Sequence, residues 1–330
     1  MTWKLSVLKA CSKFTVRPYC PPSGVLFPYG HIVSDVIPLH VRHLHPVLSI
    51  AKFKSDLDFL CQRYRPLQLS ELERIQGLRN CKEPARYFLL SFDDGLREGY
   101  EIIAPILRNK GVPAIFFLNS ATLDNRQLMW RHKISLLIER AQKMPGRIPP
   151  QVRVRSTRSL TARLKALRSA EQINLDDLAT FFELDFDEYL RRVKPYLTTS
   201  QILELANAGF EFGAHSESHP YFNTLTVEDQ KRQVSESVRS IRGLGLSCRY
   251  FAFPFHDSGV PRSVFDHITD LGVNLSFGTS EGRLDSVPFS FQRFSLEGGD
   301  GDSSLPELLK QQSTKSSVRN LCGIDVIRRN

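Results

Sequence analysis

Short apolar runs alternate with amphipathic stretches along most of the chain. Residues 87–90 and 114–118 are continuous apolar runs, which are typical of strands buried on both faces of a parallel sheet. Between them, the spacing of apolar residues over 102–107 predicts a helix that ends near Gly111. Because strands and helices alternate in this way, we expect a parallel α/β sheet or barrel.

The same alternation covers the rest of the chain except for a break at 126–198. We interpret the break as a mainly helical insertion in a barrel domain of residues 24–300, which follows an N-terminal arm at 1–23 and precedes a C-terminal tail at 301–330. Further strands are predicted at 25–27, 210–212, 250–253 and 274–278, and further helices at 53–61 after Ser49, 70–73 with a capping box, 202–206, 226–241, 261–271 and 305–309.

The composition is that of an ordinary globular protein, with 41% hydrophobic and 24% charged residues. This excludes a disordered, collagen-like or low-complexity chain. The six cysteines are scattered and form no Cys-x-x-Cys pair, so we expect reduced thiols. Lys4 and Lys9 interrupt the first apolar residues, and no stretch approaches the roughly 18 apolar residues of a membrane span. We therefore expect a soluble cytoplasmic protein, with peripheral membrane association left open.

Two acidic side chains directly follow one of the predicted buried strands. Asp93 and Asp94 lie at the carboxyl end of this strand, where parallel α/β folds build their sites. Adjacent carboxylates that are partly desolvated repel each other, which favours a bound cation. Successive side chains of an extended strand point apart, so one carboxylate could bind a metal while the other handles a proton. A helix N-cap followed by an Asp-Gly turn is the structural alternative.

A second polar cluster follows the strand predicted at 210–212. His215 and His219 have the His-x3-His spacing that recurs among metal ligands. The stretch is not the His-Glu-x-x-His zinc motif, because position 216 is serine and Pro220 follows directly. Two histidines and one carboxylate leave coordination positions open, as in catalytic metal sites. Two ordinary loop histidines are the alternative.

Together, the two clusters resemble motifs of the polysaccharide deacetylases of the NodB-homology type, carbohydrate esterase family 4. Residues 91–95, Ser-Phe-Asp-Asp-Gly, look like the first motif, Thr-Phe-Asp-Asp-Gly, and residues 215–219 look like the second, His-Ser/Thr-x-x-His. Residues 251–255, Phe-Ala-Phe-Pro-Phe, stand at the third motif and resemble the subgroup that carries Phe-x-Tyr-Pro there. The resemblance runs from about residue 24 to 296, interrupted at 126–198, and implies a deformed (β/α) barrel.

The resemblance also implies a metal-dependent hydrolase. By motif position, Asp94, His215 and His219 would hold a divalent metal, usually zinc, and Asp93 would be the general base. The backbone N–H of Phe255 would hold the oxyanion. The chemistry agrees with this assignment, because a bound divalent ion lowers the pKa of water toward 7 and a neighbouring carboxylate can then take the proton.

One arginine of the usual family pattern is missing. The third motif commonly carries an arginine that orients the base, and this chain has Ala252 at that position. Arg293 resembles a C-terminal arginine of the Phe-x-Tyr-Pro subgroup. We expect Arg293 to pair with Asp93 or with the substrate. A surface arginine at a strand end is the alternative.

The late Leu-x-His that supplies the family's general acid is also missing. His256, directly after the third motif, is a candidate for the acid. His31 resembles a Tyr-His-x-Val element of many relatives and is predicted to line the site. His40, His43 and His45 have no counterpart in the resemblance and are predicted to be loop residues.

The net charge of +9 raises the question of an acidic partner. Residues 140–170 hold nine basic residues and no acidic one, and residues 171–188 then hold seven acidic residues. Such blocks favour helices that pair with each other. The chain has no zinc finger, RNP motif or sustained basic helix, so nucleic acid is not an expected partner. We expect the insertion to cover the barrel mouth, with contact to a phosphate-bearing, lipid-linked sugar as a further hypothesis.

The sequence thus favours a deacetylase that removes N-acetyl groups, or as a second choice O-acetyl groups, from a polysaccharide, oligosaccharide or lipid-linked sugar. A carboxylate base beside three metal ligands favours an enzyme, since a binding module does not need the base. A non-catalytic carbohydrate-binding relative and a zinc amidase acting on another small amide are the alternatives.

Overall fold

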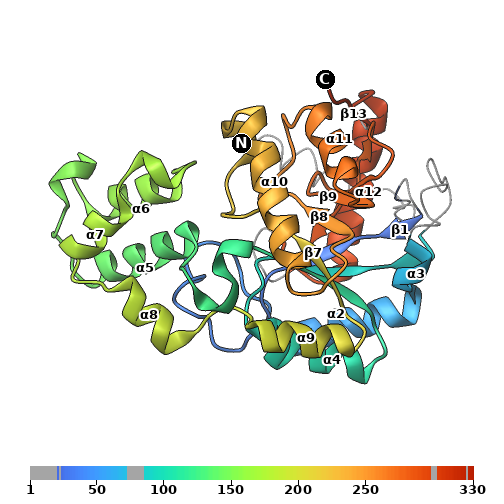
Figure 1. Ribbon diagram of the computed structural model, residues 1–330, viewed down its shortest axis with the longest axis horizontal. Coiled ribbons are helices and arrows are strands. Elements are labelled where there is room, and N and C mark those ends of the chain that lie inside the picture. Colours follow the sequence, from blue (N-terminus) through green and yellow to red (C-terminus); the bar gives the residue numbers. More distant parts are fainter. Residues whose placement is uncertain (1–20, 22–23, 73–84, 299–302, 325) are drawn as a thin grey trace.

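An eight-stranded parallel sheet forms the centre of the molecule (Figure 1). The computed structural model describes residues 21, 24–72, 85–298, 303–324 and 326–330, so the predicted arm at 1–23 lies outside it except for Pro21. In spatial order the strands are β11 (Ser290–Gln292), β9 (Leu275–Gly278), β8 (Tyr250–Ala252), β7 (Glu211–Ala214), β6 (Ala114–Leu118), β5 (Leu90–Phe92), β2 (Pro28–Gly30) and β12 (Phe294–Ser295).

The two edges of this sheet are joined by a single residue. β11 and β12 lie at opposite ends of the strand order, and only Arg293 separates them in the chain. The sheet therefore curls into a nearly closed barrel, which confirms the predicted (β/α) barrel. This junction between β11 and β12, the seam of the barrel, also brings Arg293 from the C-terminal part of the chain to the centre of the molecule, where it is fully buried.

Helices cover the outside of the barrel. They are α2 (Ile50–Arg63), α4 (Ala104–Asn109), α9 (Thr199–Asn207), α10 (Val227–Arg242), α11 (Arg262–Asp270) and α12 (Leu305–Leu321). Alternation along the strands divides the buried residues into two sets. On β6, Phe116 packs into the large cluster shared with the helices, and Phe117 packs into a second cluster with Phe27 and Phe277. The continuous apolar run of β6 is thus buried on both faces, as predicted.

Two predicted elements differ in detail from the structure. The run at 87–90 is divided between β4 (Tyr87–Phe88) and β5, because β4 pairs with β1 (Val25–Leu26) and β3 (Arg65–Pro66) in a separate sheet. The helix predicted at 70–73 is α3 (Leu69–Leu72), so Ser70 lies inside the helix and the predicted capping box is wrong. Glu73 lies outside the described residues. Ser49 does cap α2, since its side chain accepts a hydrogen bond from the Lys52 amide.

The insertion consists of helices that lie together on one side of the barrel (Figure 1). They are α5 (Trp130–Gln142), α6 (Thr157–Lys165), α7 (Leu175–Phe181) and α8 (Phe186–Val193). Their apolar faces form a second large core, with Leu160 and Leu178 fully buried, and this core also includes residues outside the insertion such as Ile32 and Leu96. Part of the basic stretch pairs with the acidic stretch, as expected, through Arg147 and Glu183 at 2.7 Å.

The C-terminal residues pack against the barrel. The predicted helix at 305–309 is longer than expected, because α12 continues to Leu321, and Ser304 with Glu307 forms its capping box. β13 (Val326–Ile327) pairs with β10 (Leu284–Asp285), and the buried Arg329 forms an ion pair with Asp285 at 2.5 Å. Across the described residues, no helix has the length and apolar character needed to span a membrane.

Candidate active site

The acidic pair lies where β5 ends. The Asp93 amide donates to the Gly30 carbonyl at 3.0 Å, which continues the strand pairing by one residue. Asp94 then has a φ of 71°, in the left-handed region that non-glycine residues rarely adopt, and Gly95 follows with a φ of 61°. Both carboxylates line one pocket, but they have different partners: Asp94 faces two histidines and Asp93 faces an arginine. Left-handed backbone of this kind concentrates at functional sites.

The two histidines lie two strands away, at the end of β7. The His215 amide donates to the Leu118 carbonyl at 2.9 Å, and the chain then turns through Ser216, whose φ is 68°. The Ser216 hydroxyl accepts a hydrogen bond from the His219 amide at 3.0 Å. This tight turn brings the His215 and His219 rings to 5.1 Å between centroids.

Asp94, His215 and His219 together form a buried cluster with metal-ligand spacing. Their candidate ligand atoms lie within 4.8 Å of one another, and each residue is at most 5% exposed. Asp94 Oδ1 is 3.2 Å from His219 Nε2 and 3.7 Å from His215 Nε2. Asn119 donates to the same oxygen at 3.1 Å, which orients the carboxylate.

The protonation of the two imidazoles suits a metal. His215 Nδ1 lies 2.8 Å from the Ala252 carbonyl, which only accepts, so Nδ1 carries the proton and Nε2 is free to coordinate. Burial lowers the pKa of His215 to about 4 and the pKa of His219 to about 3. Both rings are therefore neutral at pH 7, which is the state that binds metal. The three residues fit a two-histidine, one-carboxylate centre with open positions.

Asp93 is not part of this cluster but is bound by Arg293. The guanidinium donates to both carboxylate oxygens, at 2.7 and 2.8 Å, and also to the Ser91 hydroxyl at 3.0 Å. Burial raises the pKa of Asp93, but the charges of Arg293 and His215 outweigh it and lower the pKa to about 2. Asp93 is thus ionised at neutral pH, and its oxygens are fixed beside the candidate metal ligands.

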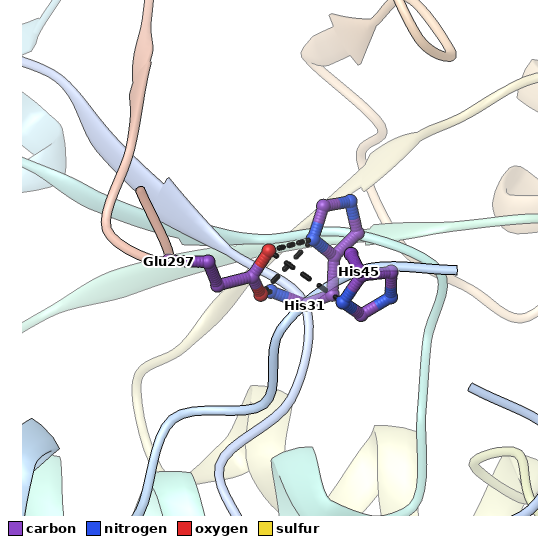
Figure 2. Close-up of side chains that lie close together, drawn as sticks. All are labelled: His31, His45 and Glu297. Carbon is purple, nitrogen blue, oxygen red and sulfur yellow. Dashed lines mark hydrogen bonds and ion pairs between the residues drawn. The ribbon is translucent and has the colours of Figure 1, made fainter. Parts of the chain in front are cut away.

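His31 pairs with a residue that sequence patterns did not identify, Glu297 (Figure 2). Glu297 accepts hydrogen bonds from the His31 amide at 2.8 Å and from its Nδ1 at 2.9 Å. His45, predicted to be a loop residue, stacks on His31 with ring centroids 4.5 Å apart. Burial lowers the pKa of His31, but the Glu297 charge outweighs it and raises the pKa to about 10. Burial lowers the pKa of His45, so only one of the stacked rings is charged at pH 7.

The donor atoms of His31, His45 and Glu297 also lie within 4.8 Å of one another. However, His45 Nδ1 lies 2.9 Å from the Pro46 carbonyl and must carry a proton there. His31 Nδ1 is likewise engaged with Glu297. We therefore interpret this cluster as an imidazolium–carboxylate pair with a neutral ring stacked on it.

The remaining predicted residues, Phe255 and His256, line the same pocket, which has a volume of about 360 Å³. Phe255 has a φ of 56° and packs against the His219 ring at 4.5 Å. No acceptor for the Phe255 amide occurs among the described residues. His256 also lines the pocket, but its buried Nδ1 has no hydrogen-bond partner in the described part of the chain.

All eight predicted site residues thus lie in or directly beside one pocket, whereas four residues of the pocket region were not predicted as site residues. Glu297 follows β12, and an acid at the end of a strand is the same signal that identified Asp93. His45 has no such signal, because its loop returns to the barrel mouth only in the folded chain. Arg131 comes from the insertion, as does Arg168 of the basic stretch.

The fold and the site thus define a (β/α)-barrel protein with an Asp-His-His cluster and a separate buried aspartate at the carboxyl ends of its strands. The family model described as polysaccharide deacetylase matches residues 80–275, more than half of the chain, and the chain belongs to this family. A search of curated proteins gives no match.

Solved structures share the fold at low sequence identity. The deacetylase PplD of Streptococcus pyogenes, in complex with acetate, has 14% identity and a TM-score of 0.55, over 87% of this chain and 97% of its own. IcaB from Ammonifex degensii has 16% identity and a TM-score of 0.54, over 88% and 97%. BC0361, a polysaccharide deacetylase from Bacillus cereus, has 12% identity and a TM-score of 0.53, over 87% and 68%.

Proposed function

We propose that this chain is a metal-dependent deacetylase that hydrolyses N-acetyl groups, and as a second choice O-acetyl groups, on a saccharide. The observation that carries the proposal is that the two adjacent aspartates have different partners. Asp94 faces the two histidines, whereas Asp93 is held apart by Arg293. Family membership supports deacetylation as the reaction.

Asp94, His215 and His219 are the residues that would hold the cation, and zinc suits one carboxylate and two imidazoles. When bound, such a cation polarises the acyl oxygen and makes water acidic enough to attack at neutral pH. Asp93 accepts the proton of the attacking water, and Arg293 keeps the carboxylate ionised and oriented. The N–H of Phe255, which has no acceptor among the described residues, would donate to the oxyanion that forms on the substrate.

The leaving amine needs a proton, and His31 is the best-placed donor. Its pairing with Glu297 keeps the ring protonated at neutral pH, and both His31 and the candidate metal ligands line the pocket. His256, the acid expected from sequence, has no carboxylate partner among the described residues. We therefore assign the general acid to His31 and leave His256 as a residue of the pocket wall.

Metal removal tests the proposal. The metal-free protein should release no acetate from a panel of N-acetylated oligosaccharides, and added Zn²⁺ should restore release. A zinc-loaded protein that binds the saccharides without releasing acetate would instead be a carbohydrate-binding relative. Release from simple acetamides but from no saccharide would identify an amidase of another substrate class.

The proton donor gives a separate pH prediction. In Glu297→Gln the charge that raises the His31 pKa is removed, so burial should leave that pKa below its ordinary value of about 6.5. Activity that requires protonated His31 would then fall as pH rises through 6.5 instead of about 10. At pH 8 we expect a loss of roughly 30-fold or more in kcat/KM, since about 3% of the rings or fewer stay protonated.

A pH–rate profile of wild type, Glu297→Asp and Glu297→Gln measures this shift. Glu297→Asp keeps the negative charge beside His31 and should therefore retain much of the activity at alkaline pH. Glu139→Gln is the matched control, because Glu139 also pairs with a histidine, His43 at 3.0 Å, outside the pocket. An unshifted profile in Glu297→Gln would assign the proton donor to another group.

A further inference from the structure

Two arginines of the insertion line the pocket that contains the candidate metal ligands. Arg131 lies in the first turn of α5, and Arg168 lies in the segment after α6. Neither guanidinium has a carboxylate within ion-pair distance in the described ranges, and the hydrogen bond that Arg131 donates to the Lys165 carbonyl is long at 3.4 Å. Two guanidiniums on one pocket wall thus carry positive charge that no acid of the described ranges offsets.

Aromatic faces hold the two guanidiniums in place. Tyr221 and Phe255 stack in parallel with centroids 3.7 Å apart. Arg168 lies over the Tyr221 ring at 4.7 Å, and Arg131 lies 5.3 Å from Trp130 and 5.9 Å from Phe255. Stacking uses the flat face of a guanidinium and leaves the N–H groups at its edge available for an acceptor.

The same aromatic residues connect the arginines to the catalytic end of the pocket. Trp130 Nε1 donates to the His219 carbonyl at 2.9 Å, which fixes the start of α5 against the loop of candidate ligands. Phe255 touches both the His219 ring and Arg131. Arg131 and Arg168 lie on the rings of one stacked pair, Phe255 and Tyr221, so the two cations repel each other. Burial lowers the pKa of Arg131, and the charge of Arg168 lowers it further.

The ionic groups of the pocket are therefore unevenly distributed. Around the candidate metal centre, Asp93 is balanced by Arg293 and Glu297 by His31. On the insertion side, two positive charges have no counterpart among the described residues. A ligand that places an anion beside Arg131 and Arg168 would relieve their repulsion while its neutral acyl group lies at the metal centre.

We propose that Arg131 and Arg168 bind a phosphate ester carried by the acetylated saccharide. The identity of the saccharide rests on the proposed function, whereas the anion site rests on the two arginines. A phosphate suits two guanidiniums better than a carboxylate does, because its oxygens can accept paired N–H bonds from both. The substrate class is thus an N-acetylated sugar phosphate or diphosphate, either soluble or attached to a lipid.

Binding and turnover of matched sugars test this site independently. The probes are N-acetylglucosamine, its 1-phosphate and N-acetylglucosaminuronic acid, titrated calorimetrically against the zinc-loaded protein, with acetate release measured separately. Charge-assisted hydrogen bonds predict that the phosphate tightens binding by at least tenfold. Arg131→Gln and Arg168→Gln should each reduce this phosphate-dependent gain about tenfold or abolish it. Arg163→Gln is the control, because Arg163 is an exposed arginine of α6 that does not line the pocket.

The outcomes separate this inference from the proposed function. A phosphate-dependent gain that needs Arg131 and Arg168 supports the site even when no acetate is released. Acetate release with equal binding of neutral and phosphorylated sugars would overturn the site and leave the deacetylase proposal intact. Tighter binding of the uronic acid than of the phosphate would overturn it as well. A third probe is the same sugar attached to a polyprenyl diphosphate in phosphatidylcholine vesicles. Tighter binding of both this probe and the soluble sugar phosphate than of the neutral sugar supports the anion site. The probe that binds more tightly then shows whether the substrate is soluble or attached to a lipid.

Discussion

Replacing Asp93 by asparagine is expected to lower kcat by about 10²- to 10⁴-fold while zinc stays bound. The amide has the shape of the carboxylate but cannot accept the proton of the attacking water. Asp93 Oδ2 is 3.8 Å from His215 Nε2, and its oxygens are engaged by Arg293 rather than by the candidate metal cluster. The loss should therefore be a loss of chemistry and not of metal affinity.

His215→Ala should give the opposite pattern, because it removes one of three candidate ligands. Metal content measured by mass spectrometry after dialysis should fall together with acetate release. Glu217→Gln is the control from the same loop, since Glu217 faces Arg232 at 3.0 Å and does not line the pocket. Zinc lost from Asp93→Asn but retained by His215→Ala would reverse the roles of the two residues.

The parts of the fold that could be predicted are those with local causes. A continuous apolar run such as that of β6 is required wherever a strand is buried on both faces, so the run itself identifies the strand. Asp93 and His215 follow such strands directly, and parallel strands end at the same edge of a sheet. The principal site residues were therefore predictable from position along the chain, together with the motif spacing around them.

The parts that could not be predicted depend on barrel closure. Glu297 meets His31 across 266 residues, and the seam at Arg293 is what brings β12 beside β2. No local pattern encodes that contact. The same holds for His45, whose loop has no periodicity of its own. Proximity to the third motif indicated His256 as the acid, whereas the carboxylate beside His31 is apparent only in the folded chain.

The insertion shows a similar limit. Block charge predicted that basic and acidic stretches would pair, and Arg147 with Glu183 does so. Arg168 belongs to the same basic stretch but lies over Tyr221 in the pocket. A charge count treats these two arginines alike. Only the folded structure separates an arginine that is neutralised by an acid from one that lines the pocket and is available to a ligand.

Arg293→Met is expected to lower the free energy of unfolding by about 3–5 kcal/mol, because it leaves the buried Asp93 carboxylate without its partner. Arg293 and Asp93 are 0% and 3% exposed, so water cannot replace the lost hydrogen bonds. The pKa of Asp93, held at about 2 chiefly by Arg293 against burial, should rise. Denaturant unfolding of the zinc-loaded protein measures the change in stability.

A double-mutant cycle separates this ion pair from a general packing defect. Asp93→Asn with Arg293→Met removes both charges, so the double variant should be more stable than the sum of the two single losses predicts. Arg239→Met is the exposed control, since its pair with Glu236 lies on the surface and should change stability by about 1 kcal/mol or less. If the single losses simply add, the arginine stabilises the barrel seam by its volume rather than by its charge. If the single losses do not add, the two charges interact, and the residue that joins the two edges of the barrel also keeps Asp93 ionised. Closure of the barrel and ionisation of the catalytic base would then depend on the same side chain.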